Sequence, residues 1–243
     1  MITDEHIAGY IDSLERNLPK HLGELERQAL ADNVPIIRKP AQSLLRFLIN
    51  DRKPKRILEV GTAVGFSASL MAEYMPEGAT LTTIEKVPMR IAPAKENLRR
   101  SDRKSDITLL IGDANDVLKA LNGNGGFVTE VYLPGEDRLI ASPDIEKYKG
   151  TYDFIFMDAA KGQYMNFYPE IIKLLSDDGI FITDNVLQEG SIASSKFSVT
   201  RRDRTIHMRM RQYLYTLTHD ERIDTVVLPV GDGMTLSIRT KQI

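Results

Sequence analysis

Short apolar segments alternate with helix-like segments through the middle of this 243-residue chain. The apolar segments are nearly continuous, which is typical of strands that are buried on both faces of a parallel sheet. The alternation therefore predicts an α/β fold in which helices cover both sides of the sheet. We expect strands at 56–60, 80–85, 107–111, 152–157 and 179–183, and helices at 66–75, 88–100 and 164–175.

Both ends of the chain and one internal stretch depart from this alternation. Residues 1–50 carry apolar stripes at helical spacing, which predicts an N-terminal helical region. Near the other end, 225–229 and 234–238 flank a Gly-Asp-Gly turn, so we expect a hairpin and an antiparallel last strand. The turn-rich segment 122–150 is interpreted as a surface insertion. We expect the whole chain, 1–243, to form a single domain.

Composition excludes several classes of protein. Lys and Arg total 32 and Asp and Glu total 34, so the formal charge of −2 excludes a globally basic nucleic-acid coat protein, although it allows a local basic patch. The chain has no cysteine, which excludes disulfides, Cys-ligated zinc, iron–sulfur clusters and thiol nucleophiles. No apolar run approaches the roughly 18 residues of a membrane span. We therefore expect a soluble, cytoplasmic protein with no membrane partner.

A glycine or an acid stands at the end of each of the first three expected strands. Gly61 and Gly65 follow the first strand, Glu85 ends the second, and Asp113 with Ala114 follows the third. Acids at the carboxyl ends of parallel strands can accept hydrogen bonds from ribose hydroxyls or an adenine amino group. Because G-x-G-x-x-G and G-K-[ST] are both absent, we expect a nucleoside without phosphates, with S-adenosylmethionine as the candidate. The alternative is that the glycines only form a tight strand–helix connection.

Oxygen-bearing side chains follow the fourth and fifth strands. Asp158 follows the fourth strand, and Asp184 and Asn185 follow the fifth, so we expect all three on one rim of the sheet. Two carboxylates and an amide oxygen suit Mg²⁺, Mn²⁺ or Ca²⁺. The alternative is that each Asp only caps a helix. Lys161 lies close to Asp158 in the chain and is the candidate general base, the alternative being a solvated or substrate-orienting lysine.

Three motifs, at 59–67, 158–164 and 183–187, resemble those of the metal-dependent O-methyltransferases, a family that includes catechol and caffeoyl-CoA enzymes. They read E-V-G-T-A-V-G-F-S, D-A-A-K-G-Q-Y and T-D-N-V-L. Within the family, the chain looks most like the bacterial branch that methylates 5-hydroxyuridine in tRNA. The resemblance extends from the 34–37 region to 229–233, and the motifs are specific only in combination.

The resemblance implies a Rossmann-like methyltransferase fold with a mostly parallel seven-stranded sheet and an antiparallel last strand. It also implies Mg²⁺ at Asp158, Asp184 and Asn185, and a homodimer. In the implied reaction the cation lowers the pKa of the acceptor hydroxyl, Lys161 takes its proton, and the oxygen attacks the methyl group. The implied contacts to S-adenosylmethionine come from residues that match the family's cofactor positions: Ile37, Gly61, Ser67, Glu85, Asp113, Ala114 and Asp158.

A basic segment near the C-terminal end indicates which molecule could accept the methyl group. Residues 196–211 contain six Lys or Arg residues and one acid, which gives a net charge of +5. Arg201, Arg202 and Arg204 are candidate contacts for the phosphates of a tRNA anticodon stem-loop. We therefore expect methylation of 5-hydroxyuridine at the wobble position to 5-methoxyuridine. The alternative interpretation of the segment is a solvated helix face.

Three aromatic residues bear on the same choice. Tyr164, Phe167 and Tyr168 are interpreted as stacking on an exposed base, or alternatively as core or dimer-contact residues. The runner-up activity is that of a small-molecule catechol- or caffeoyl-CoA-type O-methyltransferase, which needs an apolar wall beside the metal and no basic patch. A third hypothesis, a cofactor-binding protein without catalysis, is disfavoured because the metal ligands and Lys161 are all retained.

Overall fold

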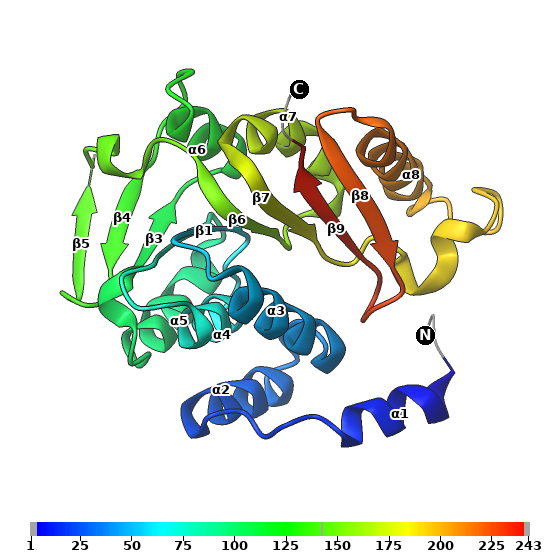
Figure 1. Cartoon of the computed structure of the whole chain (residues 1–243), viewed down its shortest axis with the longest axis horizontal. Helices are drawn as coiled ribbons and strands as arrows, with labels where there is room; N and C mark the ends of the chain where they lie inside the picture. Colours follow the sequence, from blue (N-terminus) through cyan, green and yellow to red (C-terminus); the bar gives the residue numbers. More distant parts are fainter. Residues whose placement is uncertain (1–3, 142, 241–243) are drawn as a thin grey trace.

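A computed structural model of the chain describes residues 4–141 and 143–240. Over these residues the strands form one nine-stranded sheet in the order β5-β4-β3-β2-β1-β6-β7-β9-β8 (Figure 1). The strands are β1 (Arg56–Val60), β2 (Thr80–Glu85), β3 (Ile107–Ile111), β4 (Glu130–Leu133), β5 (Arg138–Ala141), β6 (Tyr152–Met157), β7 (Leu175–Thr183), β8 (Ile223–Leu228) and β9 (Met234–Arg239).

Five neighbouring strands in the middle of the sheet are parallel. β3, β2, β1, β6 and β7 pair side by side, and most of their residues are buried, as continuously apolar strands require. β9 runs antiparallel between β7 and β8, as the hairpin signal predicted. The Rossmann-like α/β fold with an antiparallel last strand is therefore confirmed. The strand number is not, because the described sheet has nine strands instead of the expected seven.

The two additional strands come from the segment 122–150, which we expected to be a surface insertion. β4 pairs antiparallel with β3, and β5 pairs antiparallel with β4. Val131 and Tyr132 of β4 are buried, whereas β5 is mostly exposed. Each strand has only four residues, too few for a clear alternation of apolar and polar side chains. The segment therefore extends the sheet and contributes to the core.

Helices cover both faces of the sheet. In Figure 1, α3, α4 and α5 lie below the strands, and α6, α7 and α8 lie above them. The lower layer closes an apolar cluster that includes Phe66 and Phe154, and the upper layer closes one that includes Ile171 and Phe181. The helices are α1 (Glu5–Ser13), α2 (Lys20–Ala31), α3 (Lys39–Arg52), α4 (Phe66–Tyr74), α5 (Pro88–Arg99), α6 (Ala114–Leu121), α7 (Tyr164–Leu174) and α8 (Arg204–His219).

The N-terminal region is helical from its first described residues onward, as predicted. Asp4 caps α1 by accepting hydrogen bonds from the backbone N–H groups of His6 and Ile7. The apolar stripe of α1, which includes Ile7 and Tyr10, is exposed, because α1 extends away from the sheet (Figure 1). Within the described ranges, the helices lack the combination of length and apolarity that crossing a membrane requires.

Candidate active site

A cavity of about 560 Å³ opens at the carboxyl ends of the parallel strands. This volume lies in the usual range for small-ligand sites, roughly 300–1,000 Å³. Pro35, Ile36 and Arg38, from the segment that leads into α3, close one side of it. Eight of the site residues that the sequence predicted line the cavity: Gly61, Glu85, Asp113, Ala114, Asp158, Lys161, Asp184 and Asn185.

Gly61 brings the ends of β1 and β6 together. Its φ of +107° lies in the region that favours glycine, and a Cβ atom at this position would overlap the carbonyl oxygen of Asp158. The backbone N–H of Asp158 donates to the carbonyl oxygen of Val60 at 3.0 Å, so the two strands remain paired up to this turn. Gly61 thus forms the tight connection that was the alternative interpretation, and it also lines the cavity.

Two acids of the cavity are held in place by contacts with the loops that follow β1 and β2. The carboxylate of Glu85 accepts hydrogen bonds from the backbone N–H groups of Ala63 (2.9 Å), Lys86 (2.8 Å) and Val87 (2.7 Å). Asp113 is the N-cap of α6, and its carboxylate lies 2.8 Å from Nζ of Lys86. The hydrogen bond from Lys86 lowers the pKa of Asp113. Both carboxylates therefore present fixed acceptor oxygens where β2 and β3 end.

Asp158 and Asp184 lie at the ends of the neighbouring strands β6 and β7. Burial raises the pKa of Asp158 to about 6. Burial and the nearby charge of Asp158 raise the pKa of Asp184 to about 7. Asn185 has a left-handed φ of 57°, and its backbone N–H donates to Oδ1 of Asp184 at 2.6 Å. Two carboxylates that repel each other at a buried rim favour a cation beside them.

The donor set at this rim fits a divalent cation. Carboxylate and amide oxygens are the hard ligands that Mg²⁺ and Ca²⁺ prefer. Within residues 4–141 and 143–240, no group of three or more His, Cys, Asp or Glu side chains is arranged for a metal. The candidate ligands are therefore the carboxylates of Asp158 and Asp184 and the side chain of Asn185, and water or acceptor oxygens would complete the coordination shell.

Lys161 begins the short 3₁₀ helix η3 (Lys161–Gln163) and lines the cavity. Its Nζ lies 3.7 Å from Oδ2 of Asp232, a buried acid in the turn between β8 and β9. Our sequence analysis did not identify Asp232. The Gly-Asp-Gly pattern marked the turn, but no local signal indicates that this turn folds back against Lys161.

Ile37 and Ser67 are absent from the described lining of the cavity. Ile37 is buried in an apolar cluster, and its neighbours Pro35 and Ile36 line the cavity instead. Ser67 lies in the first turn of α4 and donates its hydroxyl to the buried carboxylate of Glu59. Their roles in cofactor binding stay predictions.

The three aromatic residues of α7 belong to the core. Tyr164 and Tyr168 pack edge-on against Tyr213, and the hydroxyl of Tyr164 donates to the carbonyl oxygen of Asp184 at 3.2 Å. Phe167 is also buried, and it forms part of the cavity wall. The interpretation that these rings stack on an exposed base is therefore wrong for Tyr164 and Tyr168, and the alternative, a place in the core, is confirmed.

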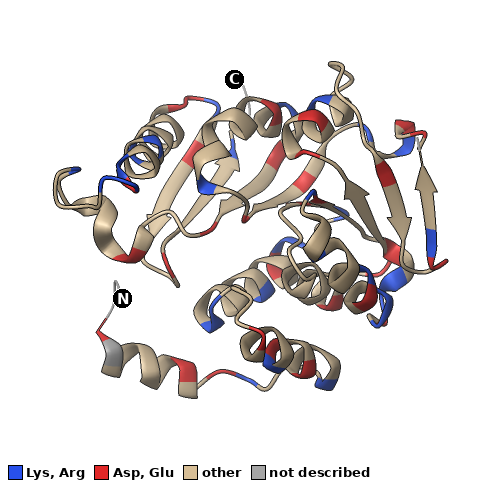
Figure 2. Ribbon diagram, turned by 180° about the vertical axis from the view of Figure 1, so that it is seen from behind, with Lys and Arg blue, Asp and Glu red and all other residues tan. Residues whose placement is uncertain are grey.

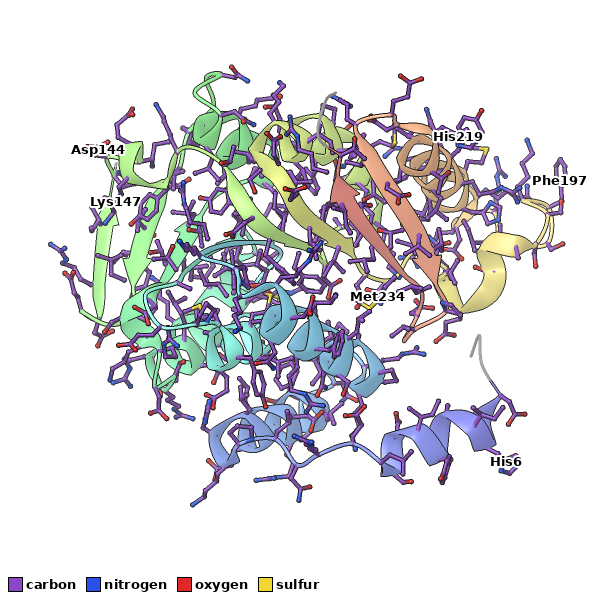
Figure 3. The ribbon with its side chains drawn as sticks, viewed as in Figure 1. His6, Asp144, Lys147, Phe197, His219 and Met234 are labelled. Carbon is purple, nitrogen blue, oxygen red and sulfur yellow. The ribbon has the colours of Figure 1, made fainter. Side chains whose placement is uncertain are left out.

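The basic segment 196–211 forms the loop before α8 and the first half of that helix. Figure 2 marks its Lys and Arg positions along α8 and the adjoining loop, and Figure 3 shows the exposed side chain of Phe197 in that loop. Arg201 and Arg202 are exposed and Arg204 is partly exposed, and all three are absent from the described lining of the cavity. Nη1 of Arg209 donates to the carbonyl oxygen of Gly162 at 2.9 Å, so α8 lies beside η3. The segment therefore adjoins the site without entering it.

The fold and the cavity define the class of protein. A Rossmann-like sheet with acids at the carboxyl ends of successive strands is the architecture of enzymes that bind nucleoside cofactors. The family model described as O-methyltransferase matches residues 12–132 and 136–240. The chain therefore belongs to the O-methyltransferase family, as its motifs indicated.

Known relatives agree with this assignment. A caffeoyl-CoA O-methyltransferase of Stellaria longipes is 28% identical over 199 residues, which cover 82% of this chain and 74% of the relative. A catechol O-methyltransferase of Niastella koreensis is 28% identical over 199 residues, covering 80% and 77%. The S-adenosylhomocysteine-bound structure of the Podospora anserina methyltransferase PaMTH1 has a TM-score of 0.76 and 27% identity, covering 98% of this chain and 95% of that protein.

Proposed function

We propose that this O-methyltransferase transfers a methyl group from S-adenosylmethionine to a hydroxyl of a small catechol-type acceptor. The observation that carries the proposal is that two groups of functional residues line the same cavity, at the carboxyl ends of the parallel strands. Glu85 and Asp113 offer acceptors for a nucleoside at the ends of β2 and β3. Asp158, Asp184 and Asn185 offer oxygen ligands at the ends of β6 and β7. The S-adenosylhomocysteine in the related PaMTH1 structure supports the choice of methyl donor.

The residues of the rim suit the two halves of the reaction. When bound, S-adenosylmethionine supplies an electrophilic methyl group, and a divalent cation supplies positive charge beside the acceptor hydroxyl. Asp158, Asp184 and Asn185 would hold that cation. Lys161, in its amine form, would take the hydroxyl proton on Nζ. The cavity would hold the acceptor oxygen beside the methyl group, and this proximity would favour transfer of the methyl group from sulfur to oxygen.

We favour a small phenolic acceptor over a nucleobase on a folded RNA for two reasons. Phe167, Ile36 and Pro35 line the cavity and supply the apolar wall that an aromatic ring needs. Two relatives are named for caffeoyl-CoA and catechol. These observations favour the small-molecule hypothesis over the tRNA hypothesis, which reverses our order of preference from the sequence.

Methylation of 5-hydroxyuridine in tRNA is the second candidate. The exposed basic segment 196–211 beside η3 is the observation that favours it, because exposed arginines suit backbone phosphates. The anticodon stem-loop as a partner, the homodimer and the cytoplasmic location stay predictions.

The two candidates are separated by offering both acceptors to one enzyme preparation. The purified protein is incubated with labelled S-adenosylmethionine and Mg²⁺, with either catechol and caffeic acid or tRNA that contains 5-hydroxyuridine. We expect methylation of the phenols, its loss in EDTA, and a decrease of about 100-fold in Asp184→Asn, because the cation's contribution is worth several kcal/mol.

The matched control is the double variant Arg201→Ala with Arg202→Ala. It should methylate the phenols at the wild-type rate, since both arginines lie outside the cavity wall. Methylation of tRNA alone, with strong salt dependence and loss in this double variant, would instead establish the second candidate.

A further inference from the structure

Asp232 is a buried acid that the proposed reaction does not yet use. It lies in the turn between β8 and β9 and is only 6% exposed. One carboxylate oxygen, Oδ1, accepts a hydrogen bond from the backbone N–H of Glu189. The other, Oδ2, lies 3.7 Å from Nζ of Lys161. The carboxylate thus joins the candidate base to the loop that follows β7.

The same turn fixes the loop that carries the candidate metal ligands. The backbone N–H of Leu187 donates to the carbonyl oxygen of Asp232 at 3.0 Å, and that of Val186 donates to Gly233 at 2.9 Å. Gly233 has a φ of +84°, and a Cβ atom there would overlap the side chain of Leu187. The turn therefore packs directly against the two residues that follow Asn185.

Three carboxylates act on Lys161. Lys161, Asp158 and Asp184 line the same cavity, and the positive charge of Lys161 lowers the pKa of both acids. Within the described residues, Lys161 forms its ion pair with Asp232. A lysine that paired with Asp158 or Asp184 would compete with a cation for the same oxygens.

We propose that Asp232 is a positioning residue, which holds Lys161 beside the acceptor site and away from the oxygens of Asp158 and Asp184. This inference rests on the proposed function, because it assigns a partner to the base of that reaction. Once Lys161 has released one proton to solvent, its Nζ takes the proton of the acceptor hydroxyl, and the negative charge of Asp232 stabilises the ammonium ion that forms again.

The test is a double-mutant cycle on Mg²⁺ affinity, measured from the rise in Tm with Mg²⁺ concentration. Asp232→Asn keeps a hydrogen-bond acceptor for Glu189 and removes the charge that holds Lys161. We expect Asp232→Asn to weaken Mg²⁺ binding about 10-fold, since the released lysine neutralises the carboxylates. The effect of Lys161→Ala on Mg²⁺ affinity is then compared in two backgrounds. In Asp232→Asn it should strengthen Mg²⁺ binding by a factor at least about 3-fold larger than in the wild-type protein.

Equal effects of Lys161→Ala in the two backgrounds would overturn the proposal, because a merely structural role of Asp232 gives additive changes. Asp224→Asn, at an exposed position of β8, is the control and should leave Mg²⁺ affinity unchanged. If Asp232→Asn does not fold, Asp232→Ser takes its place in the cycle with the same expected signs. The measurement needs no methyl acceptor, so its result does not depend on whether phenols are methylated. If Mg²⁺ does not change the Tm of the wild-type protein, the proposed metal site itself is contradicted.

A second measurement uses the phenol reaction. Asp232→Asn should lower kcat at least about 10-fold, because general-base catalysis is worth roughly 100-fold or more, while KM for S-adenosylmethionine stays within about 2-fold. In a Lys161→Ala background the same change should alter kcat less than about 2-fold. Asp232→Glu, which keeps the charge, should recover most of the lost rate. Equal losses of kcat in both backgrounds would contradict a role that acts through Lys161.

Discussion

Glu59 is a buried acid beneath the glycine turn, and its contacts join three elements of the fold. It lies in β1 and accepts hydrogen bonds from the hydroxyls of Ser67 in α4 and Thr83 in β2. Burial raises the pKa of Glu59 to about 7, and the negative charges of Asp158 and Glu85 add to the effect. The protonated form of Glu59 is therefore favoured in the folded state relative to the unfolded chain.

We expect Glu59→Gln to reduce the pH dependence of stability. Because the pKa of Glu59 is raised from 4.5 to about 7 on folding, its contribution is complete below pH 4.5 and is lost as the pH rises through about 7. The loss is at most roughly 3 kcal/mol, at about 1.4 kcal/mol for each unit of pKa. Denaturant unfolding at about pH 5 and about pH 8 measures it for both proteins.

Asp158 and Asp184 also have raised pKa values, so part of the pH dependence should remain in Glu59→Gln. An unchanged difference in unfolding free energy between the two pH values would mean that Glu59 titrates in the folded protein as it does in the unfolded chain.

The β4–β5 hairpin shows how a short element is stabilised by its place at the edge of the sheet. Tyr132 is 4% exposed and packs in the lower apolar cluster. Its hydroxyl donates to Oδ1 of Asp137 at 2.6 Å, and Nζ of Lys95 lies 5.2 Å from the centre of its ring. Leu139, on the outer strand β5, is 45% exposed. The inner strand is therefore part of the core, and the outer strand covers its free edge.

We expect Tyr132→Ala to destabilise the protein by about 3 kcal/mol or more, because the substitution leaves a cavity in a packed cluster. Leu139→Ala is the matched control and should cost less than about 1 kcal/mol, since its side chain is already in contact with water. Urea unfolding of both variants measures the difference. Similar small losses in both would show that the hairpin is an appendage and not part of the core.

At the scale of the whole molecule, the sheet brings four acids together at the carboxyl ends of its parallel strands. Glu85, Asp113, Asp158 and Asp184 line one cavity, together with the basic residues Arg38, Lys86, Arg90 and Lys161. They meet because parallel strands all end at the same edge, although the residues are far apart in the chain. The cost of this arrangement is the burial of carboxylates and the repulsion between them, which together raise the pKa of Asp184.

We expect Mg²⁺ to raise the Tm of the whole protein by a few degrees, because a cation that binds only the folded state stabilises it. The rise should be larger at about pH 8 than at about pH 6, since Asp158 and Asp184, with pKa values of about 6 and about 7, must lose their protons to bind the cation. Differential scanning fluorimetry with and without Mg²⁺ measures both effects.

Asp184→Asn should abolish the rise in Tm with Mg²⁺, whereas Asp224→Asn, at an exposed position, should retain it. A rise of equal size in both variants would show that Mg²⁺ acts elsewhere on the protein.

Much of the fold and part of the site could be predicted from local sequence. Four strands begin and end where the apolar runs do, and the residues after them line the cavity: Arg56–Val60, Thr80–Glu85, Ile107–Ile111 and Tyr152–Met157. The helix α8 was predicted only as the alternative interpretation of the basic segment, because its basic side chains obscured the buried positions of His207, Met210 and Tyr213. Tyr164 and Tyr168 were misassigned because an aromatic residue next to a candidate site has the same local pattern whether it faces the site or the core.

The sequence by itself determined how the central strands and helices alternate along the chain, and which residues follow each of those strands. It could do so because hydrophobic periodicity and turn residues are local properties. Only the tertiary structure decided which distant residues meet. It brought the turn at Asp232 to Lys161, placed β4 against β3, and buried the rings of α7, since each of these contacts joins segments that local periodicity does not relate.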